Sequence, residues 1–210
     1  MEINVKMKTK NFKGWAVKKD RPEEYLQSPV DYYTDDEVER YSRSGGMRRA
    51  QERIAYRVLE LLGLKKGSSL LDLGSGPGYT AKIYTLEGYK VACLDLIPKM
   101  VEKAKEEGFE SYLGDMKEIK KFFPKRKFDG VVSVSALQWI KDKEGIEKVA
   151  LGIHFVLKKE GVCVIQFYPR SEGELNEVAD IFCKKGFKGE IVTDWPEVPK
   201  NRTTYLVLKK

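Results

Sequence analysis

The stretch that decides the fold is Leu70–Thr80, with the sequence Leu-Leu-Asp-Leu-Gly-Ser-Gly-Pro-Gly-Tyr-Thr. A short apolar run stops at three glycines on alternate positions, and an amphipathic run begins at once after them. This pattern predicts a buried strand, a tight turn and the start of a helix. Glycine has no Cβ, so the turn can adopt backbone angles that other residues avoid and can let a ligand approach the main chain. The free N–H groups at the helix start favour a polar or anionic ligand group.

The glycine spacing separates this turn from the dinucleotide-binding turns. Gly74, Gly76 and Gly78 read Gly-x-Gly-x-Gly, whereas dinucleotide folds use Gly-x-Gly-x-x-Gly. An acid, Asp72, lies two residues before the first glycine, and Ser75 lies inside the turn. The segment from Asp72 to Gly78 therefore resembles the first motif of class I S-adenosylmethionine (SAM) methyltransferases. An ordinary glycine-rich turn between a strand and a helix is the alternative, because single glycine patterns are weak signals.

Length and composition indicate one globular domain. The chain has 210 residues, of which 41% are hydrophobic, and no apolar run is long enough to span a membrane. The N-terminus lacks the apolar stretch of a signal peptide. Cys93, Cys163 and Cys183 lie far apart inside apolar runs, which favours small core residues over a zinc site. These features predict a protein of the reducing cytoplasm.

The charge is basic and uneven. The net charge is +7, with seven Lys or Arg residues in 1–21 against two acids, and six in 117–127 against Glu118 alone. Basic patches suit a polyanionic partner such as RNA. A solvated Lys/Glu-rich surface of the thermophile type is the other interpretation.

The N-terminal third is predicted to form an arm and a helical cap. Residues 1–30 show no sustained period and predict a basic, extended arm. Residues 31–66 predict two helices, 35–43 and 47–62, separated by Gly45-Gly46 and stopped by Gly63. We expect these helices to cover a pocket at the strand ends of the core, residues 67–210.

From residue 67 the pattern alternates between strands and helices. Strands are predicted at 70–73, 90–96, 109–113, 129–134, 161–168, 190–194 and 203–208, and helices at 79–87, 98–107, 145–157 and 171–185. Alternation implies a parallel α/β sheet with right-handed crossovers. The last two strands have no helix between them and predict an antiparallel hairpin. A seven-stranded, mostly parallel, Rossmann-like sheet with a C-terminal antiparallel hairpin is the class I SAM methyltransferase architecture, and it leaves the third strand at an edge.

Ligands of open α/β sheets bind beyond the carboxyl ends of the strands. Asp95 ends the second strand, where its carboxylate can accept from both ribose hydroxyls, with Leu96 and Ile97 beside it for a purine ring. Capping of the helix at Pro98 is the structural alternative for Asp95. Asp115 and Met116 come after the third strand, where Asp115 could accept from an exocyclic adenine amine or simply stabilise a turn.

The residues after the fourth strand indicate the methyl acceptor. Residues 133–139 lack the Asn/Asp-Pro-Pro-aromatic motif of enzymes that methylate exocyclic base amines. No cysteine is placed as a nucleophile, and the lone histidine, His154, flanks an inward helix face, which favours a structural role. A ring nitrogen with a free lone pair, such as guanine N7, needs only alignment with the methyl group. Trp139 and Tyr168 are candidates to stack the target base, or to pack in the core.

With these residues placed, the chain resembles the small-subunit (18S-type) rRNA guanine-N7 methyltransferases, the family of the yeast bud-site-selection protein and the human Williams–Beuren region protein, as an archaeal-type member. Ser133-Val-Ser-Ala-Leu-Gln-Trp139 is similar to the family's Ser-Ile-Ser-Ala-Ile/Val-Gln-Trp. The resemblance runs from about Arg21 to Leu208. Further matching positions are Arg21-Pro22-Glu23, Tyr33, Glu39, Tyr41, Arg43, Met47, Gln51, Gln166-Phe167-Tyr168-Pro169, Gly186-Phe187 and Tyr205–Leu208.

The resemblance implies a cofactor and partners. It implies a SAM site that includes Tyr41 and Arg43 near the methionine end, with Arg43 pairing its carboxylate, together with Asp72, the glycine turn and Ser133. Ribosomal RNA of the pre-small subunit is the implied substrate, with no membrane partner. A small zinc-ribbon activator protein would dock along the third strand at Phe109–Leu113, whose free edge favours β-augmentation.

Some positions depart from the family pattern. Gly46 stands where an arginine is expected, 142–147 is shorter than in eukaryotic members, and the basic tail is reduced to Lys209-Lys210. Two other functions therefore stay open. One is a small-molecule SAM methyltransferase, and the other is a SAM-binding ribosome-assembly factor with little catalysis.

Overall fold

The computed structural model describes residues 21–125, 127–198 and 201–210, so most of the expected arm, residues 1–20, lies outside the described range. One seven-stranded sheet has the order β3-β2-β1-β4-β5-β7-β6. All neighbours are parallel except β7, which is antiparallel to both β5 and β6. The predicted fold class, its C-terminal hairpin and the edge position of the third strand are confirmed. The strands are β1 (Ser69–Leu73), β2 (Lys90–Asp95), β3 (Glu110–Leu113), β4 (Phe128–Val134), β5 (Leu157–Phe167), β6 (Lys188–Asp194) and β7 (Thr203–Lys209).

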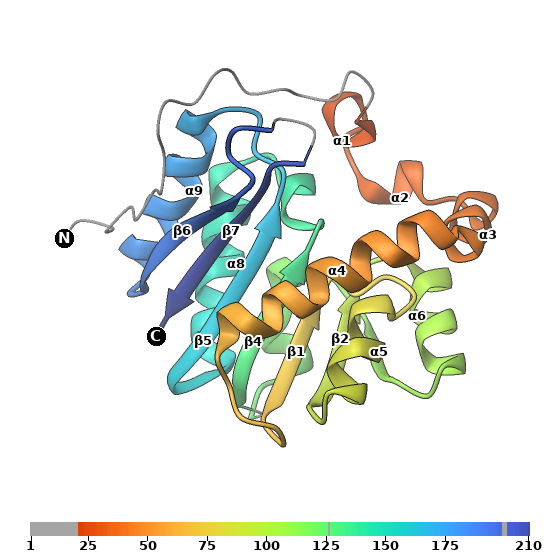
Figure 1. Cartoon of the computed structure of the whole chain (residues 1–210), viewed down its shortest axis with the longest axis horizontal. Coiled ribbons are helices and arrows are strands. Elements are labelled where there is room, and N and C mark those ends of the chain that lie inside the picture. Colours follow the sequence, from red (N-terminus) through yellow and green to blue (C-terminus); the bar gives the residue numbers. More distant parts are fainter. Residues whose placement is uncertain (1–20, 126, 199–200) are drawn as a thin grey trace.

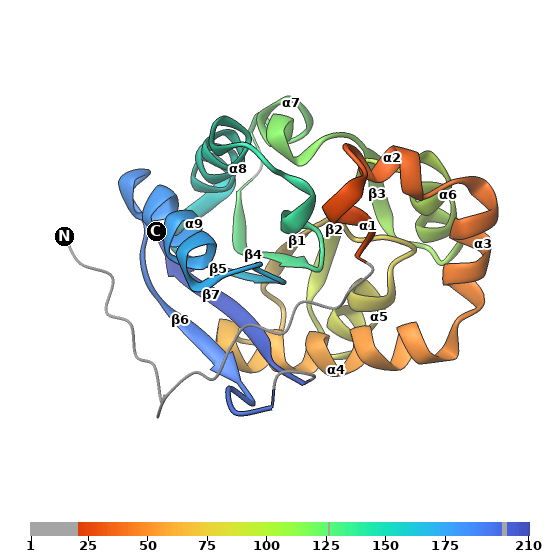
Figure 2. The same cartoon turned by 90° about the horizontal axis from the view of Figure 1, so that it is seen from above.

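Helices cover both faces of the sheet (Figures 1 and 2). On one face lie α4 (Gly45–Leu62) and α5 (Tyr79–Leu86), and on the other α8 (Lys143–Val156) and α9 (Glu172–Lys184). Successive residues of β4 belong to different core clusters: Val131 packs with the α8 and α9 side and Val132 with the α4 and α5 side. The central strands β1 and β4 are mostly apolar because both of their faces are buried. The remaining elements of the core are α6 (Pro98–Glu106), η1 (Met116–Glu118), α7 (Ile119–Phe122) and η2 (Leu137–Trp139).

The N-terminal segment differs from its predicted form in two places. Residues 21–30 hold most of two short helices, α1 (Pro22–Tyr25) and α2 (Pro29–Tyr32), rather than an extended chain. Each begins at a proline, the residue whose fixed φ and missing N–H suit the first helical position. Next, α3 (Asp35–Arg43) is confirmed, but α4 begins at Gly45 rather than Met47. The Ser44 hydroxyl accepts from the Met47 amide at 3.3 Å and caps α4, so the two glycines fall in its first turn.

The sheet order places a crevice beside β1. Crossovers from β1 lead to β2 on one side, and β4 lies on its other side, so the carboxyl ends of β1 and β4 flank the topological switch point. Leu73 at the end of β1 pairs with Leu94 and Ser133. The short helices α1 and α2 lie over this end of the sheet (Figure 1). Among the described residues, no helix is both long and apolar enough to cross a bilayer.

Candidate active site

A cavity of about 1240 Å³ lies over the carboxyl ends of the strands and under the N-terminal helices. Pockets for single small ligands are about 300–1,000 Å³, so this one has room for more than a single small molecule. The site residues predicted from the sequence come from seven separate segments, and the fold brings most of them here. Ten of them line the cavity: Tyr41, Gly74, Gly76, Asp95, Leu96, Ile97, Asp115, Met116, Trp139 and Tyr168.

The glycine turn forms one wall of the cavity with its main chain. Gly74 has φ +70°, and a Cβ built on it would lie 2.3 Å from the Ala136 Cβ. The residues after β4 therefore pack directly against the turn after β1. Gly78 has φ +91° and begins α5 outside the cavity lining, where a Cβ would meet the Phe109 ring at 2.7 Å. Gly74 thus permits contact with Ala136 after β4, and Gly78 permits contact with Phe109 before β3.

Asp95 is buried against this turn. Its Oδ2 accepts from the Gly76 amide at 2.7 Å, and its Oδ1 accepts from the Ile97 amide at 2.9 Å. Burial raises the pKa of Asp95, although these backbone hydrogen bonds oppose the shift. Ile97 caps α6 without any side-chain hydrogen bond, so Asp95 is not the cap of that helix. Each carboxylate oxygen keeps a lone pair, which leaves Asp95 able to accept from a ligand.

Asp115 has a turn-stabilising role and a place in the cavity. Its Oδ1 accepts from the Lys117 amide at 2.8 Å and caps η1, and its Oδ2 lies 3.2 Å from the Lys117 Nζ. It also lines the cavity beside Met116. A turn-stabilising acid and a ligand acceptor are therefore compatible at this position.

Asp72 and Ser133 lie beneath the turn, outside the cavity lining. Asp72 is fully buried, and its Oδ2 accepts from the Thr80 hydroxyl at 2.6 Å. Its Oδ1 has no hydrogen-bond partner among the described residues. Burial raises the pKa of the Asp72 carboxyl to about 7. The Ser133 hydroxyl donates to the Leu73 carbonyl at 2.9 Å and joins β4 to β1. Both side chains support the turn from below, whereas Ser75 lines a small adjoining pocket.

Tyr41 and Arg43, both expected near the methionine end, have different surroundings. Tyr41 lines the cavity, and its ring stacks on that of Tyr79 with centroids 5.8 Å apart. The Tyr79 hydroxyl donates to the Ser42 carbonyl at 2.8 Å, which ties the end of α3 to the start of α5. The Arg43 side chain is 82% exposed, lies 3.8 Å from Glu39 and does not line the cavity. The structure does not bring Arg43 to the other candidates.

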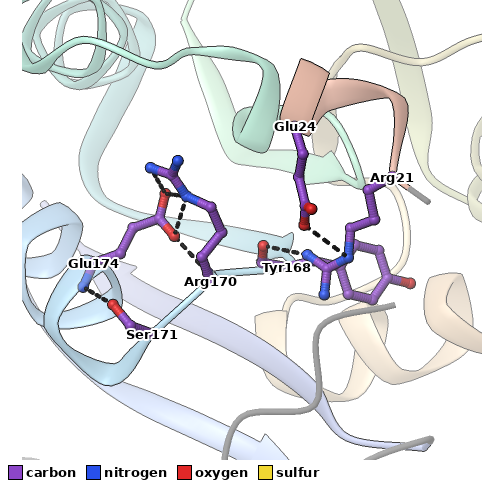
Figure 3. A network of polar contacts seen from close by, with 6 residues as sticks. All are labelled: Arg21, Glu24, Tyr168, Arg170, Ser171 and Glu174. Atoms are coloured by element: carbon purple, nitrogen blue, oxygen red, sulfur yellow. Dashed lines mark hydrogen bonds and ion pairs between the residues drawn. The ribbon is translucent and has the colours of Figure 1, made fainter. Parts of the chain in front are cut away.

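Aromatic side chains form the roof of the cavity. The Trp139 ring lies 6.2 Å from Tyr32 and 6.1 Å from Tyr33, which come from α2 and the residue after it. Burial raises the pKa of Tyr33 and of Tyr41, so both stay neutral at physiological pH. The Arg21 guanidinium donates to the Tyr168 carbonyl at 2.9 Å and lies 5.4 Å from the centre of its ring. Figure 3 shows this contact, with Glu24 beside Arg21 and the Arg170–Glu174 pair at the start of α9.

The single described histidine and the three cysteines lie away from the cavity. His154 packs edge-on against Phe187 at 5.4 Å, and burial together with neighbouring lysines lowers its pKa. Burial raises the pKa of all three cysteine thiols. None of these four residues lines the cavity.

Several cavity residues were not predicted from the sequence. They are Arg53 and Arg57 on α4, and Trp195 and Arg202 in the connection between β6 and β7. They carry no motif and lie far in sequence from the glycine turn. The only signal for α4 was the spacing of Arg49, Arg53 and Arg57 at four-residue intervals on a predicted helix.

Comparison with known proteins agrees with this geometry. The family model described as "Methyltransferase domain" matches residues 71–165, and the one for protein-L-isoaspartate(D-aspartate) O-methyltransferase matches residues 20–111. Among solved structures, magnesium protoporphyrin IX methyltransferase from Synechocystis with bound SAM superposes with a TM-score of 0.68 at 16% identity, covering 87% of this chain and 95% of that one. At that identity the likeness concerns the fold alone.

Two curated relatives are closer in sequence. The 18S rRNA (guanine-N(7))-methyltransferase bud23 of Schizosaccharomyces pombe is 33% identical over 201 residues, which cover 90% of this chain and 74% of the relative. The 18S rRNA (guanine(1575)-N(7))-methyltransferase of Saccharomyces cerevisiae is 34% identical over 188 residues, covering 84% and 68%. Because both relatives are more than 30% identical and the alignments cover over two thirds of each chain, this chain belongs to the 18S rRNA (guanine-N(7))-methyltransferase family.

Proposed function

We propose that the chain transfers a methyl group from SAM to N7 of a guanosine in small-subunit ribosomal RNA. The observation that carries the proposal is the cavity itself, which joins two strand-end carboxylates to two base-sized aromatic rings. Asp95 and Asp115 line one part of it, and Trp139 and Tyr168 line another. Family membership supplies the reaction, because the relatives named above are rRNA guanine-N7 methyltransferases.

The residues present fit SAM. The main chain at Gly76 forms an open part of the wall, since the nearest atom to a Cβ there would be the Met100 Sδ at 4.0 Å. In this proposal Asp95 accepts from the ribose hydroxyls, and Asp115 accepts from the adenine amine. Leu96, Ile97 and Met116 lie against the purine, and Tyr41 lies near the amino-acid end. When bound, SAM supplies an electrophilic methyl group on a sulfonium centre.

The reaction needs positioning rather than a base. The N7 lone pair of guanine would form the new N–CH₃ bond as the S–CH₃ bond breaks, the sulfur would keep that electron pair in the product S-adenosyl-L-homocysteine, and no proton would leave the ring. The protein therefore has to hold the base in line with the methyl group, which is catalysis by proximity and orientation. Trp139 and Tyr168 would hold it by stacking, although Arg21 already covers one face of the Tyr168 ring. Tyr33 and Tyr41 also line the cavity, and these tyrosines would stay neutral beside the positively charged product base.

The test uses purified protein, SAM labelled on its methyl group, and small-subunit particles or rRNA from a strain that lacks the gene. We expect label in rRNA as N7-methylguanosine, located by cleavage of the RNA at the modified base. Label in a small molecule but not in RNA would favour a small-molecule methyltransferase. Tight SAM binding with no transfer to any rRNA would favour an assembly factor.

The free edge of β3 supports a protein partner. Within the described residues β3 pairs only with β2, and Leu113 is 50% exposed. A small zinc-ribbon protein could extend the sheet here by adding a strand. The complex with the zinc-ribbon protein should have a higher melting temperature than this chain alone, and Leu113→Asp should weaken co-purification of the two proteins.

We further propose a cytoplasmic location, in keeping with three free cysteines. Fluorescence imaging of a tagged chain would check this location.

A further inference from the structure

The turn after β6 holds an exposed tryptophan in a strained backbone. Trp195 has φ +53°, and its side chain is 67% exposed at the rim of the cavity. A bulky residue in the left-handed region strains the backbone, and such positions cluster at functional sites. An exposed indole also gains nothing from core packing. The Trp195 indole is therefore a candidate contact for a ligand in the cavity.

Two arginines fix the turn from either side. Arg57 on α4 donates to both oxygens of Asp194, at 2.9 and 3.0 Å. Arg202 donates to the Pro196 carbonyl through its Nη2 at 2.8 Å. The residues before and after Trp195 are thus held, so the indole is presented at a defined place rather than on a loose loop.

A row of arginines on α4 leads to the same place. Arg49, Arg53 and Arg57 are spaced by four residues, so they lie about 6 Å apart along one side of the helix. Glu60 and Asp194 neutralise Arg57. Arg49 and Arg53 form no ion pair or hydrogen bond within the described part of the chain, and Arg53 lines the cavity. Arg53, one turn before Arg57, thus brings a positive charge that has no partner among the described residues to the cavity that Trp195 also lines.

We propose that Trp195 and Arg53 bind the nucleotide next to the target guanosine, with its base stacked on the indole and its phosphate against the guanidinium. The inference rests on the proposed function and concerns how that site holds its RNA. Single strands are bound by this combination of aromatic faces and positive charge. The net charge of +7 favours a polyanion over a neutral ligand.

The variant Trp195→Gly separates function from folding. Glycine adopts φ +53° freely, so the fold should keep or raise its melting temperature while the ring is lost. Trp195→Phe keeps an aromatic face and should restore binding. Tyr56→Ala is the matched control, because Tyr56 is an aromatic residue on α4 that is 47% exposed but does not line the cavity. Arg53→Gln removes the charge.

Binding is measured by fluorescence anisotropy with a single-stranded RNA of about 12 nucleotides that contains one guanosine, across a range of KCl concentrations, and SAM affinity is measured by calorimetry. Trp195→Gly should weaken RNA binding roughly 5- to 100-fold, the effect of losing one base stack. Arg53→Gln should reduce the slope of log affinity against log salt by about 0.7. SAM affinity should not change in either variant.

Each outcome decides something. Unchanged RNA affinity in Trp195→Gly, an equal loss in Tyr56→Ala, or no RNA binding by the wild-type chain would overturn the inference. The inference would also be overturned if Trp195→Gly lowered the melting temperature and Trp195→Phe did not restore RNA binding. Trp195 would then have a structural role. If the wild-type chain methylates rRNA, the proposed function survives any of these results. If it methylates none while Trp195→Gly still loses RNA binding, the proposed function fails and the RNA surface stands.

Discussion

The guanidinium of Arg57 and the carboxylate of Asp194 form a two-point ion pair between α4 and the end of β6, 137 residues apart in the sequence. This contact joins α4 to the last hairpin at the wall of the cavity, which both residues line. The two side chains are 34% and 26% exposed, so solvent screens the pair in part. Bidentate arginine–carboxylate pairs are nevertheless among the stronger ion pairs.

Arg57→Ala should therefore destabilise the fold by about 1 kcal/mol, equivalent to roughly 2–4 °C in melting temperature for a chain of this size. Circular dichroism melting of Arg57→Ala, Asp194→Ala and the double variant gives the coupling between the two residues. The control is Arg48→Ala, since Arg48 lies 3.9 Å from Glu52 and is 59% exposed. If Arg48→Ala and Arg57→Ala lowered the melting temperature equally, the Arg57–Asp194 pair would contribute no more to stability than an ordinary surface ion pair.

Asp95→Ala should weaken SAM binding by about 1–3 kcal/mol, the scale of hydrogen bonds to a charged group. The variant also releases the Gly76 and Ile97 amides, which the carboxylate now holds. Asp129→Ala is the control, because Asp129 likewise accepts from a backbone amide, that of Ser69, but lies outside the cavity lining. It should change stability and leave SAM affinity intact. Calorimetry showing the wild-type affinity in Asp95→Ala would exclude Asp95 from the site.

How far the sequence predicts this molecule depends on where each residue lies. The strands and the glycine turn were predictable because their signals are local: apolar runs buried on both faces, and alternate glycines after an acid. The beginning of α4 was not, because a glycine pair resembles a break unless the Ser44 cap is known. Arg53 and Trp195 could not be found either, since they meet the cavity only through tertiary packing of α4 against the last hairpin. Arg43 shows the opposite case: its place in a motif predicted a cofactor contact, but its side chain faces solvent.

The buried carboxyl of Asp72 predicts an unusual pH dependence of stability. Burial raises its pKa in the folded chain to about 7, above the unfolded value of 3.8. The folded state therefore holds a proton that the unfolded state releases between these values. The contribution of Asp72 to stability is full below about pH 4 and is lost as the pH rises through 7.

Asp72→Asn should remove this loss. Urea unfolding at a series of pH values from mildly acidic to mildly alkaline should show the wild-type chain losing stability relative to Asp72→Asn as the pH rises, and most of the change should lie below about pH 7. Thr80→Val deletes the hydrogen bond that lowers the pKa of Asp72, so its loss of stability should extend to higher pH. Parallel curves for the wild-type chain and Asp72→Asn would contradict a raised pKa.

Gly74→Ala should combine backbone strain with a steric clash. Gly74 has φ +70°, and the new Cβ would lie 2.3 Å from the Ala136 Cβ. The matched control is Gly63→Ala at φ +59°, where a Cβ would meet nothing within 4 Å, so it should show strain alone, on the order of 1 kcal/mol. Overpacking should add about 1–3 kcal/mol in Gly74→Ala.

The double variant Gly74→Ala with Ala136→Gly tests this clash directly. Removing the Ala136 Cβ takes away the atom that the new methyl group would meet, so the double variant should be more stable than the sum of the two single changes requires. The strain at φ +70° stays, and the residual loss should approach that of Gly63→Ala. Additive losses in urea unfolding would show that the residues after β4 move aside freely. In that case the contact between Gly74 and Ala136 would not set the distance between the methyl-donor wall and the ring of Trp139.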